Sequence, residues 1–466
     1  MHRIKRKVEM TQLSYTVKFS KTVLAFLVGS LLNQTAFALE ALSDDSLGDT
    51  TGEGIAFLPE NFKMVFQQAN DGLTTTQNAA NLADRSKDTG FIRTIPVGPL
   101  TSTAISAGAK KADLFLYGLA LSQTDNDVNS RFSNKGASSG TDKNPWVLGV
   151  ETAQVPNFKG NVKSLSYLQI EAPWATSVQL NNTDTIKLGI WADLYARDPS
   201  IAAAVDPLKG APNTTAGLTD KLRLQMIANG LYLNGSQIRI FQTLDGATNA
   251  GGLSENYNST LGLGALLRLN THYNSGGGGP ANGVGWNDKV LRISTRELTG
   301  TAKDLTTPAI SGGAAANFEG TEGVFIYSPN INLVLGSIYQ PLIIDTPDGK
   351  NLSLEVTRIP NVAAVYNNIY TDYDNLSSAT YKGSTCNVRY CGSNGAAGYQ
   401  GNNATHSSIS IGKVDFADNN RTLNITDKTI NTHGITMNGP SGKVNLGSAA
   451  IDGLLIQHLK ITTTGL

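Results

Sequence analysis

The sequence predicts a mainly β protein, built as an extended antiparallel sheet or a β-sandwich with long Gly-, Asn- and Ser-rich loops and few short helices. Three observations predict it: apolar and polar residues alternate through much of the chain, 48 of the 466 residues are glycine, and 16% are charged. Alternation indicates strands, because successive side chains point to opposite faces of a sheet. Soluble domains usually hold about 25% charged residues. The shortage of Glu and Lys therefore argues against a long helical bundle.

Alternation is clearest in two segments. In residues 186–195, Ile and Leu alternate with Lys, Trp, Asp and Tyr, and in residues 222–228, leucines and a methionine alternate with Arg and Gln. Both segments are predicted to be half-buried strands. Further strands are predicted at 114–121, 147–150, 290–294, 324–327, 409–416 and 454–461.

Turn residues predict two hairpins. The Asn-Gly pairs at 229–230 and 234–235 favour tight turns within the run 222–241, because Asn-Gly supplies the positive φ angles that such turns need. The sequence Thr-Pro-Asp-Gly-Lys at 346–350 predicts a turn between two further strands, 342–344 and 352–356.

Helix signals are few and short. Asn361 follows a proline as an N-cap, and the apolar residues of 362–369 have helical spacing. One or two helical turns are also predicted at 200–205 and at 43–48.

The strongest chain breaker is the run NSGGGGPANGVG at residues 274–285. It separates a β-rich region at 61–275 from a second one at 286–466. The run is either a domain boundary or one surface loop, in which case the two regions are continuous.

Residues 1–38 have the organisation of a secretory signal peptide. Basic residues come first, an apolar run of eleven residues follows at 22–32, and the small-x-small sequence Ala36–Ala38 comes last. The run is short of the ~20 residues that span a bilayer, which disfavours an anchor. Cleavage is predicted directly after this sequence, and translation starts at Met1 or Met10.

The signal region hides the charge of the remaining chain. All 466 residues carry 37 Lys and Arg against 37 Asp and Glu, but residues 1–38 hold six of the former and one of the latter. Residues 39–466 therefore carry 31 against 36, a net charge of −5. This excess of negative charge disfavours nucleic acid as a partner, because the chain has no excess of Lys and Arg to neutralise the phosphates.

Cys386 and Cys391 are the only two cysteines, and they lie in a polar loop. An exported protein meets an oxidising compartment, so a disulfide is predicted; closing so short a loop stabilises the fold by roughly 2 kcal/mol at most on the chain-entropy estimate. A metal site would need two more ligands, and only His406 lies near in sequence.

No pattern in the chain indicates catalysis. The four histidines of residues 39–466 are scattered, and no Gly-x-Ser-x-Gly elbow lies beside a candidate base. Residues 125–129 begin like a calcium loop, but Ser130 and Gly136 stand where an EF-hand needs Gly and Glu. We predict a non-enzymatic protein with no catalytic residues, no cofactor and no metal site.

The segment 39–60 follows the predicted cleavage site and opens with LEALSDDSLGDTTGEGI. With the preceding alanine it resembles the opening "AL-x-x-LSD-x-x-L-x-x-x-TG-x-x-GI" of exported gammaproteobacterial surface proteins, among them Fil-type pilus assembly proteins. Glu53 departs from the pattern, where Gln is commoner. The residues that we assign to an export or assembly motif are Leu42, Ser43, Asp44, Asp45, Leu47, Thr51, Gly52, Gly54 and Ile55.

The resemblance implies export and a surface role, and the family offers no established catalytic residues to carry over. We therefore expect an exported cell-envelope or surface protein, a structural or assembly component of a pilus-like or adhesive surface structure. Its expected location is the periplasm, outer membrane or cell surface of a Gram-negative bacterium.

The expected partners are signal peptidase during export and other envelope or pilus subunits, which would pair with exposed strand edges. No transmembrane helix is expected in the mature chain. The alternative is a periplasmic or surface module that binds carbohydrate or lipid, and an exported hydrolase is a third possibility.

Overall fold

The structure is a computed structural model, and the chain divides into two units, Met1–Ala38 and Leu39–Leu466. All residues described belong to the second unit. They are residues 54–67, 92–94, 103, 107–157, 160–174, 184–197, 218–244, 259–271, 287–298, 305, 316–346, 349, 351–359, 362–370, 384–386, 404–412, 415–416, 423–424 and 434–463.

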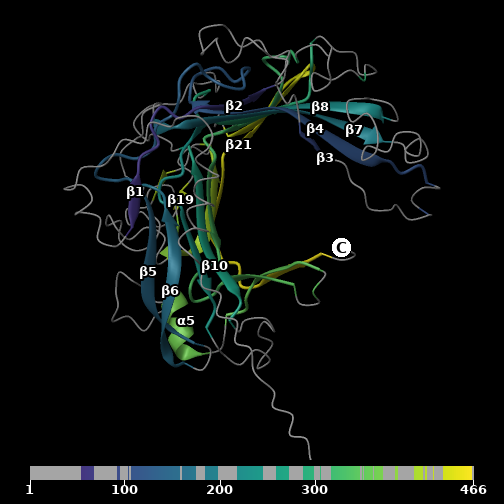
Figure 1. The fold of residues 1–466 in the computed structure, drawn as a ribbon. Helices are drawn as coiled ribbons and strands as arrows, with labels where there is room; N and C mark the ends of the chain where they lie inside the picture. Colours follow the sequence, from purple (N-terminus) through teal and green to yellow (C-terminus); the bar gives the residue numbers. More distant parts are fainter. Residues whose placement is uncertain are drawn as a thin grey trace, which may run out of the picture. The chain divides into compact units, whose positions relative to one another are not determined.

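The fold is mainly β, as predicted, and consists of two large sheets (Figure 1). The larger sheet has 12 strands, in the order β1-β5-β6-β9-β10-β13-β17-β16, with β14, β15, β22 and β23 attached beside this path. Its strands are β1 (Ile55–Phe57), β5 (Trp146–Pro156), β6 (Val162–Glu171), β9 (Gln237–Gln242), β10 (Leu261–Asn270), β13 (Asn330–Leu335), β14 (Leu342–Asp345), β15 (Ser353–Val356), β16 (Ser384–Thr385), β17 (Ala404–Ile411), β22 (Ala449–Leu454) and β23 (Leu459–Thr462).

The smaller sheet has nine strands, in the order β2-β4-β7-β8-β11-β12-β20-β21, with β3 paired to β4. Its strands are β2 (Met64–Gln67), β3 (Ile92–Thr94), β4 (Lys111–Gln123), β7 (Ile186–Arg197), β8 (Leu218–Leu231), β11 (Val290–Ser294), β12 (Gly323–Tyr327), β20 (Ile435–Gly439) and β21 (Gly442–Gly447). A separate pair is formed by β18 (Asp415–Phe416) and β19 (Leu423–Asn424).

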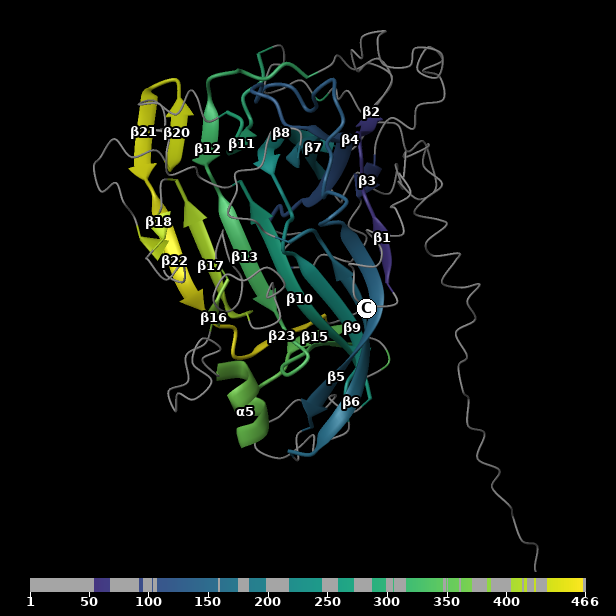
Figure 2. The ribbon, with the colours of Figure 1, turned by 90° about the vertical axis from the view of Figure 1, so that its left-hand side faces the viewer.

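From β5 to β12 the chain alternates between the sheets in pairs of strands (Figure 2). β5 and β6 form a hairpin in the larger sheet, β7 and β8 in the smaller, β9 and β10 again in the larger, and β11 and β12 in the smaller. Strands before residue 275 pair with strands after residue 286 in both sheets, as β10 does with β13 and β8 with β11. The two predicted β-rich regions thus share each sheet.

The hairpin predicted at the Asn-Gly pairs is wrong. Gly230 and Gly235 do have positive φ angles, both 79°. However, Gly230 lies inside β8, and the chain runs on from β8 in the smaller sheet to β9 in the larger. A Cβ at Gly230 would overlap the carbonyl oxygen of Asp288, so glycine is needed there for close packing.

The second predicted hairpin and the predicted helix are confirmed. β14 pairs with β15 in antiparallel register, with Leu342 opposite Val356. The helix after position 361 is α5 (Ala363–Tyr370), and it buries Val365 and Ile369. The helical turns predicted at 43–48 and 200–205 lie outside the described residues.

Most predicted strand positions are confirmed, but two of the predicted segments each cover parts of two strands. The segment predicted as one strand at 454–461 consists of the end of β22 and the start of β23, with residues 455–458 outside any strand. The segment predicted at 409–416 overlaps β17, which ends at Ile411, and the short strand β18.

Candidate functional site

The two faces of the smaller sheet have opposite chemistry, and the polar face is the buried one. Asp193 and Arg223 are cross-strand partners on β7 and β8, and both are buried. Arg223 also pairs with Glu297, and Arg197 donates to Asp113 at 2.9 Å. We call this side, which carries these five residues, the covered face of the smaller sheet.

The Arg223 guanidinium is held in its charged form. Burial alone would lower its pKa, but the hydrogen bonds and the charge of Asp193 raise it above the ordinary value for arginine. Arg292, on β11 of the same face, has no carboxylate partner among these bonds: it donates to the carbonyls of Val128 at 3.1 Å and Glu322 at 2.8 Å and to the side-chain oxygen of Asn129. Burial lowers the pKa of Arg292.

The Asp-rich loop at 125–129 binds a lysine of the sheet. The Nζ atom of Lys187, which is fully buried on β7, donates to Oδ1 of Asp125 at 2.6 Å and to the carbonyl of Asp127. The ammonium group thus supplies the positive charge at the loop that resembles the start of a calcium site.

The same loop packs Arg131 against the covered face. Gly118 and Gly189 leave room for it, since a Cβ at Gly118 would lie 2.6 Å from Cδ of Arg131 and one at Gly189 would overlap the Arg131 backbone. The guanidinium lies 5.0 Å from the ring of Trp191 and the tryptophan ring lies 5.4 Å from that of Phe318. Trp191 is therefore packed under the loop.

The larger sheet also buries polar side chains on one of its faces. We call this face the covered face of the larger sheet. Asn270 donates to Asn332 at 2.9 Å, and Asn332 donates to Ser408 at 3.2 Å, so one ladder of side chains crosses β10, β13 and β17. Arg268 is fully buried beside this ladder, and burial lowers its pKa to about 10. Its Nη1 atom lies 3.6 Å from Sγ of Cys386.

The opposite side of the smaller sheet, which we call its open face, is aliphatic. Seven successive cross-strand partners form one row over β4, β7, β8, β11, β12, β20 and β21: Leu119, Ile190, Met226, Ile293, Val324, Met437 and Val444. A second row beside it consists of Leu121, Leu188, Ala228, Leu291, Ile326 and Ile435. The exposed fraction reaches 48% for Met437 and 57% for Val444.

The larger sheet repeats this arrangement on its own open face. One row crosses β1, β5, β6, β9, β10 and β13: Ile55, Leu148, Ile170, Ile238, Ala265 and Leu335. Another consists of Leu269, Ile331, Ile409 and Ile451. Ile55 and Val150 are each 65% exposed. Water-soluble sheets usually bury the apolar face and expose the polar one. Here the open faces are aliphatic, and the covered faces combine buried polar side chains with core residues such as Phe115 and Tyr195 in the smaller sheet and Val155 and Phe241 in the larger.

Polar side chains bound each open face. In the larger sheet the apolar pair Val150 and Leu168 is followed along β5 and β6 by Thr152 and Ser166 and then by Gln154 and Ser164. In the smaller sheet, Asp220 precedes Leu222 by two residues on β8 and receives a hydrogen bond of 3.1 Å from Lys110.

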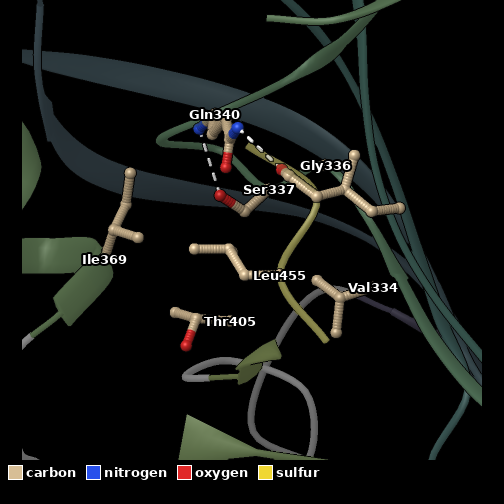
Figure 3. Close-up of a pocket in the computed structure, with 8 residues that line it drawn as sticks. Val334, Gly336, Ser337, Gln340, Ile369, Thr405 and Leu455 are labelled. Carbon is tan, nitrogen blue, oxygen red and sulfur yellow. Dashed lines mark hydrogen bonds between the residues drawn. The ribbon is translucent and has the colours of Figure 1, made fainter. Parts of the chain in front are cut away.

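A small cavity lies where α5 meets the larger sheet (Figure 3). Ile369 and Leu455 line it with Ser337 and Gln340, and the backbone N–H of Gln340 donates to the Ser337 hydroxyl at 3.1 Å. Its volume is about 20 Å³, room for a water molecule and far below the several hundred Å³ of a small-molecule site. The cavity is therefore a packing feature of this corner.

The predicted site residues fall partly outside the described chain. Of the export or assembly motif, Gly54 and Ile55 are described: Ile55 begins β1 and pairs with Leu148. Leu42, Ser43, Asp44, Asp45, Leu47, Thr51 and Gly52 lie outside the described residues, as does Cys391. Cys386 is buried and disulfide-bonded.

Sequence reasoning missed the open faces as a site. The signal was present, since both alternating segments, 186–195 and 222–228, place aliphatic residues on one side and charged residues on the other. Alternation is the same whichever face is covered, so it carried no information about burial.

Other features of the described residues bear on function. No described helix has the length and apolar character needed to cross a membrane. Within the same residues, His, Cys, Asp and Glu form no group of three that could hold a metal ion. No family model, curated protein or solved structure matches the chain.

Proposed function

We propose that the protein is an exported, non-enzymatic component of the Gram-negative cell envelope, with a structural or assembly role in a pilus-like or adhesive surface structure. The observation that carries this proposal is the pair of extended sheets with aliphatic open faces. Surfaces of this kind serve contact with other molecules, because exposed apolar area is costly in water.

The strand edges support an assembly role. Within the described part of the chain, β21 ends the path of the smaller sheet, and its Val444 and Leu446 are 57% and 58% exposed. β23 pairs with β15 alone among the described strands, and all four of its residues are exposed. Such edges offer backbone hydrogen bonds to a strand of a partner subunit.

The alternative function is a periplasmic or surface module for lipid or carbohydrate, and the aliphatic open faces favour lipid. Carbohydrate sites use accessible aromatic rings, and Trp191, which the sequence offers on a strand, is packed against Arg131 and Phe318.

Fractionation of cells, with mass spectrometry of the protein's N-terminus, tests the proposed location. We expect a chain that begins at Leu39 in the envelope fraction; a chain that keeps residues 1–38 and stays in the cytoplasm would contradict the proposal. Deletion of the gene should alter surface appendages in electron micrographs or reduce adhesion, and no change in either would contradict the assembly role.

A deletion of residues 39–53 tests the motif separately. This change leaves β1 and its pairing with β5 in place. The shortened chain should fold, shown by an unchanged urea midpoint, and fail to localise. Normal localisation would remove the motif from the mechanism of assembly.

A further inference from the structure

We propose that the acyl chains of a membrane lipid phase cover the open faces of both sheets. This rests on the proposed envelope location and names the chemistry of the partner. The two open faces are the only large surfaces of the described residues for which the structure places aliphatic side chains in unbroken cross-strand rows.

The open faces offer nothing to a polar partner. Every residue of the long row over seven strands is Leu, Ile, Met or Val, and the row over six strands of the larger sheet adds only alanine. The backbone groups along these rows belong to strands paired on both sides, apart from the terminal strands. Hydrocarbon accepts such a surface along these paired strands, because their backbone hydrogen-bonding groups are satisfied within the sheet.

The size of the faces also matters. Seven strands at ~4.8 Å spacing give the smaller sheet's open face a width of roughly 29 Å, and Leu114 to Leu121 along β4 adds a height of about 23 Å. The product, roughly 670 Å², is an upper bound, because β11, β12 and β20 have five residues each. It is comparable with the largest apolar patch on an ordinary soluble monomer, about 300–600 Å². The larger sheet adds a second face of similar kind.

A second copy of the chain suits these faces less well than lipid. Protein interfaces carry about one hydrogen bond per 100–200 Å², and the rows provide no side chain that donates or accepts one. A copy seated on one sheet would also leave the open face of the other in water, whereas fluid acyl chains cover both.

The boundaries and the covered faces agree with a lipid environment. The change from Val150 to Thr152 and Gln154 along one face of β5 marks where the apolar zone ends, and the Lys110–Asp220 pair marks an end in the smaller sheet. The buried ion pair of Asp193 and Arg223 lies on the covered face of the smaller sheet, away from the open side.

In the test, single cysteines are introduced into the full chain and each is given a fluorescent label. The labelled protein is then reconstituted into phosphatidylcholine vesicles with brominated acyl chains. Met437→Cys and Val150→Cys report on the two open faces. Gln154→Cys, four residues from Val150 on the same face of β5, and Asp220→Cys are the matched controls beyond the boundaries. Unchanged urea midpoints establish that all four variants fold.

We expect brominated lipid to remove most of the emission from labels at 437 and 150 and little from labels at 154 and 220. Aqueous iodide should give the reverse order. Iodide quenching at 437 and 150 to the same extent as at the controls would overturn the proposal, because the faces would then be in water. Labels at 437 and 150 that neither quencher reaches would also overturn it, since a second copy or another part of the chain would then cover them.

The vesicle assay is independent of where the cell places the protein. Lipid quenching together with a cytoplasmic protein in fractionation would contradict the proposed function and leave the lipid contact standing. A protein found in the envelope whose labels at 437 and 150 stay in water would contradict the lipid contact and leave the proposed function standing.

Discussion

The guanidinium of Arg223 on β8 binds both carboxylate oxygens of Asp193 on β7: Nε donates to Oδ1 at 2.7 Å and Nη2 donates to Oδ2 at 3.0 Å. The pair is buried at a cross-strand position, so its two hydrogen bonds join neighbouring strands. Glu297 approaches the same guanidinium, which therefore serves two carboxylates.

Replacing Arg223 by methionine should destabilise the protein by about 3–5 kcal/mol, because Asp193 and Glu297 would remain buried without their cation. Urea denaturation followed by circular dichroism measures the change. The double variant Arg223→Met with Asp193→Leu should regain part of the loss. Lys110→Ala at the exposed Lys110–Asp220 pair is the control, with an expected change within about 1 kcal/mol. Equal losses at both sites would contradict the account.

Gly189→Ala should cost about 1–3 kcal/mol, because the added methyl group overlaps the backbone of Arg131 and the covering loop must move. Gly439→Ala is the matched control, since a Cβ there meets no atom within 4 Å. That variant should stay within about 0.5 kcal/mol of the parent in the same urea titration. A Gly189→Ala protein as stable as the Gly439→Ala protein would show that the loop does not pack as described.

Lys63 gives the stability a pH dependence above neutrality. Burial lowers its pKa from 10.5 to about 8. Below pH 8 the lysine is charged in both states; between the two values the folded state is neutral while the unfolded state still binds the proton. The contribution of Lys63 to the free energy of unfolding therefore rises as the pH increases from about 8 to 10.5.

The variant Lys63→Met isolates this contribution. The parent should gain more stability than the variant when the urea midpoint is measured at about pH 7 and then at about pH 9. A parallel response of the two proteins would remove Lys63 as the cause. Lys110→Ala is a suitable control, because Lys110 is a lysine that the structure leaves partly exposed.

Reduction of the disulfide at Cys386 should lower the free energy of unfolding by about 2 kcal/mol, the chain-entropy value for a very short loop. The urea midpoint with and without dithiothreitol measures it. The reductant should have no effect on the variant Cys391→Ser, whose stability should match that of the reduced parent. A reductant effect that persists in this variant would exclude the disulfide as its source.

Sequence reasoning predicted the strands well and left open which of their faces is covered. The run at 186–195 was predicted as a half-buried strand with Lys187 and Asp193 on one side, and β7 has this alternation. What covers that side is decided by distant segments: Arg292 binds the carbonyl of Val128, 164 residues away in sequence. A local sequence pattern does not contain such a distant contact. Which face of the strand is covered is therefore visible only in the folded chain.

The hairpin predicted at the Asn-Gly pairs failed for a similar reason, although Asn234 and Gly235 do form a tight turn, closed by the hydrogen bond from Ser236 N–H to the carbonyl of Leu233. The pair at 229–230 has the backbone that a tight turn requires, with Gly230 at φ 79°. The same φ angle serves a strand that passes close to Asp288, and only the neighbouring chain distinguishes the two cases. The hairpin at β14 and β15 was predictable because its turn and both strands lie within 15 residues, from Leu342 to Val356.

The passage from β12 to β13 takes two residues, Ser328 and Pro329, and Ser328 has a φ of 46°. Short passages also lead from β8 to β9 and from β21 to β22, so at three places a strand of the smaller sheet continues almost directly into the larger sheet. When strands of one sheet separate, on heating or under force, the strands of the other sheet that are joined to them by these short passages are displaced as well. The two sheets should therefore melt in a single cooperative transition, and a protease that cuts within either one should release the strands of both.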